Sequence, residues 1–380
     1  MPQTFHKGAG IVRGLPSALR ARGARRPFVV HGPSAVETER ARGLFAGEEG
    51  LEPAFFGDVA PNPDEATVGR CLADYRRAGA DAIVAIGGGS VMDTAKLLIA
   101  FSSGAAEAEV LANRFEPGSG KPPYLAAPTS AGSGSESTHF AVYYQGGKKH
   151  SLANQGLKPD EVFLDPDLTL TCPRMLTLAS GCDAVCQAVE SHWSRGATPE
   201  SRAYAEEALP ALLANVLKAV DEPSSLPARE AMLFAANLAG RAIDISKTTA
   251  AHAMSYGLTS RYRLQHGLAV VAAMGPLVRL MDEERGFFAE RSFLDEAFAP
   301  FGPRFPAAFA AFREAALSRM DEASRRAAAG EGEEAVRELA AGVNAERLSN
   351  HPVALSGREI AVIYGRILAD LGADPGHDRR

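Results

Sequence analysis

Short apolar runs alternate with helical patterns in the first part of the chain. The runs at 26–30, 53–56 and 81–86 are typical of buried strands, whereas residues 65–78 have the apolar spacing of a helix. A rhythm of strand, helix and strand is typical of parallel sheets with helices on both faces. The pattern therefore predicts a doubly wound α/β domain.

The pattern changes near residue 165. Beyond this point long helical patterns dominate, and few segments have the pattern of a strand. We expect helices over 179–193, 200–220, 229–243 and 360–371. The change predicts two domains, an α/β domain over residues 1–165 and an all-α domain over residues 166–380.

Composition narrows the class of protein. A chain of 380 residues that is 46% hydrophobic can bury two sizeable cores. Its four cysteines include no C-x-x-C pair, so we expect no disulfides and a reduced compartment. We see neither a signal-peptide core nor an apolar run approaching the roughly 20 residues that span a bilayer. The net charge of −6 is mild, and it argues against nucleic acid. We expect a cytoplasmic protein with neither nucleic-acid nor membrane partners.

A glycine-rich turn follows the apolar run at 81–86. Gly87, Gly88 and Gly89 let the backbone turn tightly and bring its N–H groups close to an anion. The residues after Ser90 can continue as a helix, whose N-terminus adds positive potential. The turn predicts a diphosphate site. The alternative is a purely structural strand-to-helix turn in which Ser90 is the N-cap.

A second loop of small residues, 128–137, follows the apolar run at 124–127. Hydroxyl groups and bare backbone at a strand end suit a ribose and a phosphate in the crevice where doubly wound sheets bind ligands. Together the two loops predict a dinucleotide site.

Carboxylate and imidazole side chains form another candidate site. Asp183 lies near the start of a helix, and Gln187 at i+4 projects from the same face. His252 and His266 follow, and two nearby glycines offer breaks that would bring the imidazoles together. One carboxylate and two imidazoles suffice for zinc or ferrous iron with positions open to substrate. The alternative is a helix N-terminal charge and two ordinary polar histidines.

Taken together and in this order, these motifs resemble the iron-containing (group III) alcohol dehydrogenases. The resemblance rests on 87–96, 128–136, 181–184 and the pair His252 and His266, and it covers nearly the whole chain. It implies a dinucleotide-binding domain over the first part and a helical domain that binds metal and substrate over the rest. It also implies a metal, Fe²⁺ or Zn²⁺, at the cleft between the domains, and commonly a homodimer.

The resemblance also implies roles for single residues. Asp183, His252 and His266 would hold the metal, together with Gln187. Lys149 enters the cofactor site on the resemblance alone. The expected cofactor site comprises Gly87, Gly88, Gly89, Ser90, Asp93, Thr129, Ser130, Ser133 and Lys149.

Two positions depart from the family pattern. Gln187 stands where the family usually has a histidine, and an amide oxygen is the weaker ligand. Glycerol dehydrogenase, a related branch, binds zinc with one aspartate and two histidines, so metal binding is still expected. At the strand end near residue 31, NAD-preferring members often have an aspartate for the ribose 2′-hydroxyl. His31 or Gly32 occupies that point here, so we expect no carboxylate there and NADP to be permitted as well as NAD.

Within the family, the segments 138–140, 183–191, 246–256 and 344–352 look like phosphonoacetaldehyde reductases. The resemblance implies metal-dependent, NAD(P)H-linked reduction of an aldehyde to a primary alcohol, here phosphonoacetaldehyde to 2-hydroxyethylphosphonate. In this chemistry the metal polarises the carbonyl and the nicotinamide delivers hydride.

Three side chains are candidates for the catalytic step. Lys247 is the candidate partner of the phosphonate, with His139 second. The alternative for Lys247 is a solvated charge at a helix end. Tyr256 and His139 are candidates for protonating the product, and a structural role is the alternative for each.

Three other functions stay open for the protein as a whole. They are a group III alcohol dehydrogenase of another substrate, a lyase like dehydroquinate synthase, which shares this architecture, and a binding protein without catalysis.

Overall fold

The structure is a computed structural model that describes residues 3–117, 120–146, 148–290, 292–326, 332–343 and 348–372. Within it the chain divides into two compact units, Met1–Cys172 and Pro173–Arg380. Residues 344–347 of the segment likened to phosphonoacetaldehyde reductases lie outside the described residues.

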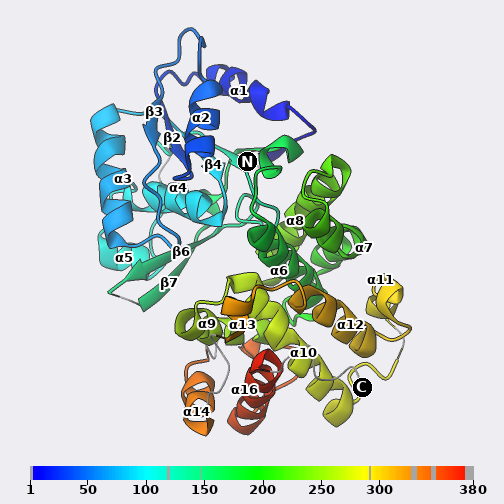
Figure 1. Ribbon diagram of the computed structural model, residues 1–380. Helices are drawn as coiled ribbons and strands as arrows, with labels where there is room; N and C mark the ends of the chain where they lie inside the picture. Colours follow the sequence, from blue (N-terminus) through cyan, green and yellow to red (C-terminus); the bar gives the residue numbers. More distant parts are fainter. Residues whose placement is uncertain are drawn as a thin grey trace. The chain divides into compact units, whose positions relative to one another are not determined.

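The first unit is built on a six-stranded parallel sheet with the order β1-β8-β5-β4-β2-β3 (Figure 1). Its strands are β1 Thr4–Lys7, β2 Pro27–His31, β3 Ala54–Phe56, β4 Ala82–Gly87, β5 Tyr124–Pro128 and β8 Glu161–Leu164. Every strand pair is parallel. The predicted doubly wound α/β fold is confirmed.

Helices cover both faces of this sheet because successive side chains of each strand point in opposite directions. Ile83 and Ala85 of β4 belong to the core beneath α3 and α4. Val84 and Ile86 belong to the opposite core, beneath α1 and α2. Burial on both faces explains why β4 is apolar without interruption. The helices are α1 Leu15–Ala21, α2 Ala35–Gly43, α3 Glu65–Ala78, α4 Gly89–Phe101 and α5 Glu107–Leu111, with short 3₁₀ turns η1 Ile11–Gly14, η2 Gln155–Leu157 and η3 Pro166–Thr169.

An antiparallel ribbon follows β5, formed by β6 (Phe140–Gln145) and β7 (Lys148–Ala153). Figure 1 shows it beside α5. This ribbon, which leads the chain from the second small-residue loop towards β8, was not predicted from the sequence.

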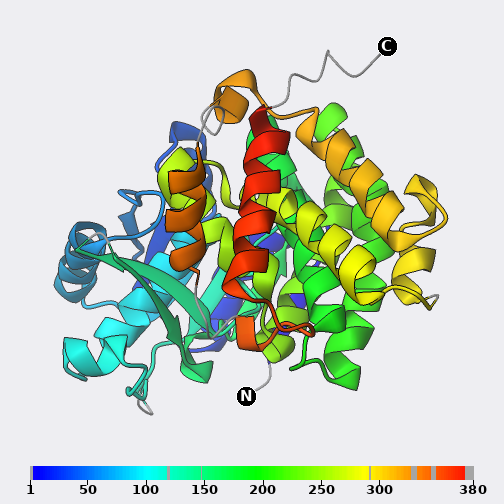
Figure 2. The same ribbon diagram turned by 90° about the horizontal axis from the view of Figure 1, so that it is seen from below.

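The second unit is helical, and its described residues contain no strand. Its helices are α6 Arg174–Trp193, α7 Pro199–Asp221, α8 Leu226–Ser246, α9 Ala250–Tyr262, α10 His266–Arg285, α11 Phe293–Ala297, α12 Phe305–Leu317, α13 Glu322–Arg326, α14 Glu333–Ala341 and α16 Gly357–Gly372, with a 3₁₀ turn η4 Ala299–Phe301. Figure 2 shows α16, in red, beside α14, in orange. Among the described residues, no helix combines the length and the apolar character needed to cross a membrane.

Helix α6 forms the centre of this unit, because it packs against α7, α8 and α10. Every residue from Thr177 to Ser191 is buried. Its polar members include Asp183, Gln187 and Glu190. Buried polar groups are costly unless they are paired, so these side chains are expected to have specific partners or a ligand.

Candidate functional site

The glycine turn lies at the carboxyl end of β4 and opens helix α4. Gly88 is the N-cap residue, and no side chain caps the helix there. Ser90 lies inside the helix, where its Oγ accepts a hydrogen bond from the backbone N–H of Asn62 at 3.2 Å. The alternative in which Ser90 caps α4 is therefore wrong. An anion can take the place of the missing cap, because helix N-termini favour negative charge.

The second small-residue loop lies directly beside the turn. A Cβ on Gly88 would come within 3.3 Å of Ser130 Oγ, and a Cβ on Gly89 within 3.2 Å of Ser133 Oγ. Side chains at these glycines would crowd the gap between the two loops. Bare backbone and hydroxyl groups at this edge of a parallel sheet fit the diphosphate of a nucleotide.

Asp93 and Lys96 of α4 hold the second loop in place. Lys96 is fully buried, and its Nζ donates a hydrogen bond to Ser135 Oγ at 3.0 Å. Asp93 accepts hydrogen bonds from Ser135 Oγ at 2.9 Å and from the backbone N–H of Val142 at 3.2 Å. Burial raises the pKa of Asp93, and the charges of Lys96 and Lys149 oppose that rise. The structure thus places Asp93 behind the loop, with Lys149 exposed on β7.

An unexpected carboxylate, that of Glu37, lies over the carboxyl end of β2. Gly32 follows β2 directly, and a Cβ built on it would overlap the carboxylate of Glu37. Glu37 lies in the first turn of α2, which folds it back over the strand end. The neighbouring His31 is buried, and its Nδ1 lies 2.8 Å from the carbonyl oxygen of Gly32. The expectation that no carboxylate stands at this point is wrong.

In the second unit, Asp183, His252 and His266 come together from α6, α9 and the first residue of α10. Their ligand atoms all lie within 4.8 Å of one another. Oδ1 of Asp183 is 3.0 Å from Nε2 of His252 and 3.9 Å from Nε2 of His266. One carboxylate and two imidazoles facing a common point fit zinc or ferrous iron.

The two glycines expected as breaks, Gly257 and Gly267, both lie inside helices, so that expectation is wrong. The chain turns between α9 and α10, where Arg263 adopts a φ of 55°. Gly267 instead permits close packing, because a Cβ there would overlap the carbonyl oxygen of Ala179 on α6. This close approach brings His266 to Asp183.

The buried carboxylate of Glu190 orients His252. Nδ1 of His252 contacts this carboxylate, and Thr249 Oγ1 and the backbone N–H of Ala251 donate to it at 2.7 and 2.9 Å. An ionised carboxylate only accepts, so Nδ1 carries the hydrogen and Nε2 is directed to the metal position. Glu190 was not among the residues predicted from the sequence, although its i+7 spacing from Asp183 places both on one face of α6.

The charges of the cluster favour a divalent cation. Burial lowers the pKa of His252, but Glu190 and Asp183 outweigh this effect and raise it to about 9. Burial raises the pKa values of Asp183 and Glu190, yet their histidine partners bring both below the ordinary range. Both carboxylates are therefore ionised, with Asp183 facing the site and Glu190 behind His252. A divalent cation held by neutral imidazoles would balance both charges.

Gln187 and Tyr256 complete the immediate surroundings. Gln187 is buried one helical turn after Asp183, and its side-chain hydrogen bond to Asp183 helps to lower the pKa of that carboxyl. Tyr256 stacks on the ring of His266, with centroids 5.8 Å apart and planes at 9°. The third catalytic candidate, His139, lies in the first unit against Phe140, with ring centroids 4.0 Å apart.

Lys247 is held in a strained backbone conformation. It ends α8 with φ 59° and ψ 170°, a region that side chains other than glycine rarely adopt. Nδ2 of Asn350 donates to the carbonyl oxygens of the two neighbours, Ser246 at 2.8 Å and Thr248 at 3.1 Å. The strained residue is thus fixed in the segment that leads to His252.

Family models match both parts of the chain. Residues 2–166 match the model described as iron-containing alcohol dehydrogenase, and residues 177–356 match the C-terminal model of the Fe-containing alcohol dehydrogenase family. The chain is 32% identical to the NAD-dependent methanol dehydrogenase of Bacillus methanolicus over 271 residues, 69% of this chain and 70% of that protein. It is also 32% identical to the phosphonoacetaldehyde reductase of Streptomyces viridochromogenes over 320 residues, 80% of each protein.

A solved structure agrees over nearly the full length. The sulfoacetaldehyde reductase from Bifidobacterium kashiwanohense, solved in complex with NAD⁺, superposes with a TM-score of 0.85 at 27% identity, covering 97% of both chains. These matches favour a dehydrogenase over the lyase and the non-catalytic binding protein. The chain belongs to the iron-containing alcohol dehydrogenase family and is an NAD-linked oxidoreductase of alcohols and aldehydes.

Proposed function

We propose that this enzyme reduces a short aldehyde with an anionic headgroup to the primary alcohol, with phosphonoacetaldehyde as substrate and 2-hydroxyethylphosphonate as product. The observation that carries the reductase proposal is the buried cluster of Asp183, His252 and His266 with Glu190 behind His252. Its residue types suit the divalent metal, ferrous iron or zinc, that carbonyl reduction would use here.

The names of two relatives support the substrate class. One is a phosphonoacetaldehyde reductase and the other a sulfoacetaldehyde reductase. Both substrates are two-carbon aldehydes that carry a tetrahedral anion. Such an anion needs cationic or N–H partners when it is bound. Lys247 is the partner that we propose, with His139 second, because Lys247 is exposed and fixed by its backbone just before His252.

The residues divide the chemistry between them. A bound divalent metal supplies Lewis acidity at the carbonyl oxygen, and the nicotinamide supplies hydride. Asp183, His252 and His266 would hold the metal, and we propose the amide oxygen of Gln187 as a further ligand. Glu190 keeps the Nδ1 hydrogen of His252 in place, which presents Nε2 to the metal.

We assign nucleotide binding to the first unit, in line with the expected domain of residues 1–165, and metal and substrate binding to the rest of the chain. The glycine turn and the second loop would hold the pyrophosphate and a ribose. Tyr256 is our candidate for delivering the proton to the product, because it stacks on His266. His139 is the second candidate. A homodimer and a cytoplasmic location both stay predictions. Size-exclusion chromatography with light scattering tests the first of them.

The experiment measures oxidation of NADH and NADPH with phosphonoacetaldehyde, acetaldehyde and lactaldehyde, after separate reconstitution with ferrous iron and zinc. We expect turnover of the phosphonate to exceed that of the neutral aldehydes by at least about 10-fold in kcat/KM. Equal turnover of all three would indicate a general aldehyde reductase instead. Asp183→Asn should abolish turnover, whereas Asp282→Asn on α10 should retain it. No turnover with either metal would contradict the proposal.

A further inference from the structure

We infer that Glu37 makes this enzyme select NADH over NADPH, by accepting a hydrogen bond from the ribose 2′-hydroxyl and repelling a 2′-phosphate. The inference rests on the nucleotide site proposed above. It adds a residue that no motif of the chain marks, because the strand position itself carries Gly32.

The first observation is where the carboxylate lies. β2 and β4 are neighbouring parallel strands, with His31 paired to Ile86. The residues after this pair, Gly32 and Gly87, therefore lie at the same edge of the sheet, about 4.8 Å apart, which is one strand spacing. A Cβ on Gly32 would overlap the carboxylate of Glu37. The carboxylate of Glu37 thus occupies space beside Gly32 that the side chain of an acidic residue at this position would enter.

The second observation is that the carboxylate is held towards the nucleotide loops. Ser34 Oγ donates to Oε2 of Glu37 at 2.7 Å, and Thr129 Oγ1 lies 3.5 Å from Oε1. Thr129 begins the second loop, at the end of β5, and is buried. Glu37 is itself half-buried. Its carboxylate therefore contacts both the start of α2, through Ser34, and the loop beside the glycine turn, through Thr129.

The chemistry of a dinucleotide explains why this position selects the cofactor. A pyrophosphate at the N-terminus of α4 places the attached ribose next to it, over the end of a neighbouring strand. A carboxylate there accepts hydrogen bonds from a ribose hydroxyl, and these charge-assisted bonds are the stronger kind. The 2′-phosphate of NADPH would instead bring negative charge to a carboxylate in a half-buried place, which is unfavourable.

Glu37 also stabilises the start of α2, and the test must distinguish this structural role from an effect on the choice between NADH and NADPH. It is the third residue of α2, and its backbone N–H donates to the N-cap Ser34 Oγ at 3.2 Å. A side chain that served only the helix end would change thermal stability when replaced. It would leave the relative affinities for the two nucleotides unchanged.

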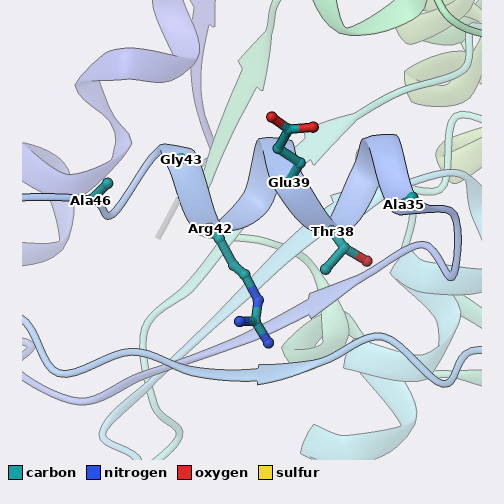
Figure 3. A pocket seen from close by; sticks show the side chains of 6 residues that line it. All are labelled: Ala35, Thr38, Glu39, Arg42, Gly43 and Ala46. Atoms are coloured by element: carbon teal, nitrogen blue, oxygen red, sulfur yellow. The ribbon is translucent and has the colours of Figure 1, made fainter.

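Helix α2 offers a matched control in Glu39. This exposed residue lines a shallow pocket of about 570 Å³ along the helix, together with Thr38 and Arg42. Figure 3 shows Glu39 and Arg42 extending from α2 in different directions. Glu39→Gln removes the same charge from the same helix as Glu37→Gln, without removing the carboxylate over Gly32.

The test is equilibrium binding of NADH and NADPH to the metal-reconstituted full-length protein without aldehyde, followed by nucleotide fluorescence. We expect the wild type to bind NADH at least about 10-fold more tightly, and Glu37→Gln to reduce that ratio on the order of 10-fold, with most of the change in NADPH affinity. Glu39→Gln should keep the wild-type ratio. Equal affinities in the wild type, or an unchanged ratio in Glu37→Gln, would overturn the inference.

A double variant distinguishes loss of the carboxylate from a general structural defect at the start of α2. Gly32→Asp combined with Glu37→Ala returns a carboxylate to the same place from the strand, and it should restore the preference for NADH that Glu37→Ala loses. Failure to restore it in a folded protein would contradict the inference. If the wild type binds neither nucleotide, the proposed nucleotide site itself is wrong and the selectivity inference falls with it. NADH binding with no aldehyde turnover would contradict only the proposed reaction.

Discussion

Glu190 accepts the Nδ1 hydrogen of His252, while Nε2 of the same ring lies 3.0 Å from Oδ1 of Asp183. Both carboxylates belong to α6, seven residues apart, so one helix holds the imidazole on both sides. The N-terminal turn of α9 stabilises the negative charge of Glu190 through the N–H groups of Ala251 and His252, at 2.9 and 3.4 Å. The orientation of Nε2 of His252 thus depends on contacts from two helices, α6 and α9.

Glu190→Gln should weaken metal binding on the order of 10- to 100-fold, because the ring of His252 loses its ionised acceptor. Isothermal titration with zinc, and metal content after dialysis against a competing chelator, measure the loss directly. Circular dichroism shows whether the variant folds. Glu283→Gln, an exposed change on α10, is the control and should bind metal like the wild type. Wild-type affinity in a folded Glu190→Gln protein would show that Glu190 has only a packing role.

Lys247→Gly should stabilise the protein while it lowers selectivity for the phosphonate. The backbone of Lys247 at φ 59° and ψ 170° stores about 1–3 kcal/mol of strain, which glycine relieves at some entropic cost. We expect a rise of about 1 kcal/mol in the free energy of unfolding. Lys247→Ala keeps the strained backbone and should not gain stability. Both variants should lose on the order of 10-fold in kcat/KM for phosphonoacetaldehyde relative to acetaldehyde.

Urea unfolding and steady-state kinetics on the same preparations separate these two effects. Equal stability of Lys247→Gly and Lys247→Ala would mean that the backbone is not strained. An unchanged ratio of the two substrates in both variants would remove Lys247 from the substrate site.

The sequence predicted those features that depend on local pattern. The helix over 65–78 is α3, with the same limits, and the expected strand at 81–86 is β4, shifted by one residue. The pairing of Asp183 with His252 joins residues 69 apart, and it was expected only because carboxylate and imidazole are known metal ligands. Residue types and the family resemblance were sufficient there, whereas the expected glycine breaks at Gly257 and Gly267 lie inside helices.

Other features depend on tertiary contacts that no local pattern encodes. Glu37 replaces the missing carboxylate at Gly32 only because α2 starts close enough to fold back over β2. Glu190 meets His252 only because α9 begins beside α6. The ribbon of β6 and β7 was not predicted, and one of its anchors, the hydrogen bond from Val142 to the buried Asp93, is likewise non-local.

His351 should make the protein sensitive to acid. It is almost fully buried and lies 3.3 Å from Thr249 Oγ1. Burial lowers its pKa to about 4, with Arg195 acting in the same direction and Glu190 opposing them. The folded protein thus keeps His351 neutral while the unfolded chain binds a proton below about pH 6.5. Stability is therefore fully present above that pH and falls as the pH drops towards 4, by up to about 3 kcal/mol.

Urea unfolding between pH 7.5 and 4.5 tests this expectation against His351→Asn, whose amide can still donate to Thr249 Oγ1. The free energy of unfolding should fall less steeply with acid in the variant than in the wild type. Parallel curves for the two proteins would show that His351 does not carry the acid sensitivity.

Gln187→His should raise the affinity for zinc or ferrous iron by on the order of 10-fold, because an imidazole replaces an amide as ligand. The side chain is buried one turn after Asp183, on the face of α6 that carries the cluster. Gln187→Ala should instead lower the affinity, since it removes both the proposed ligand and the hydrogen bond to Asp183. Metal titration of the wild type and both variants gives the order of their metal affinities directly. If Gln187 only forms a hydrogen bond to Asp183 and does not bind metal, Gln187→His will bind metal no more tightly than the wild type. The new ring would then remove that hydrogen bond without adding a ligand.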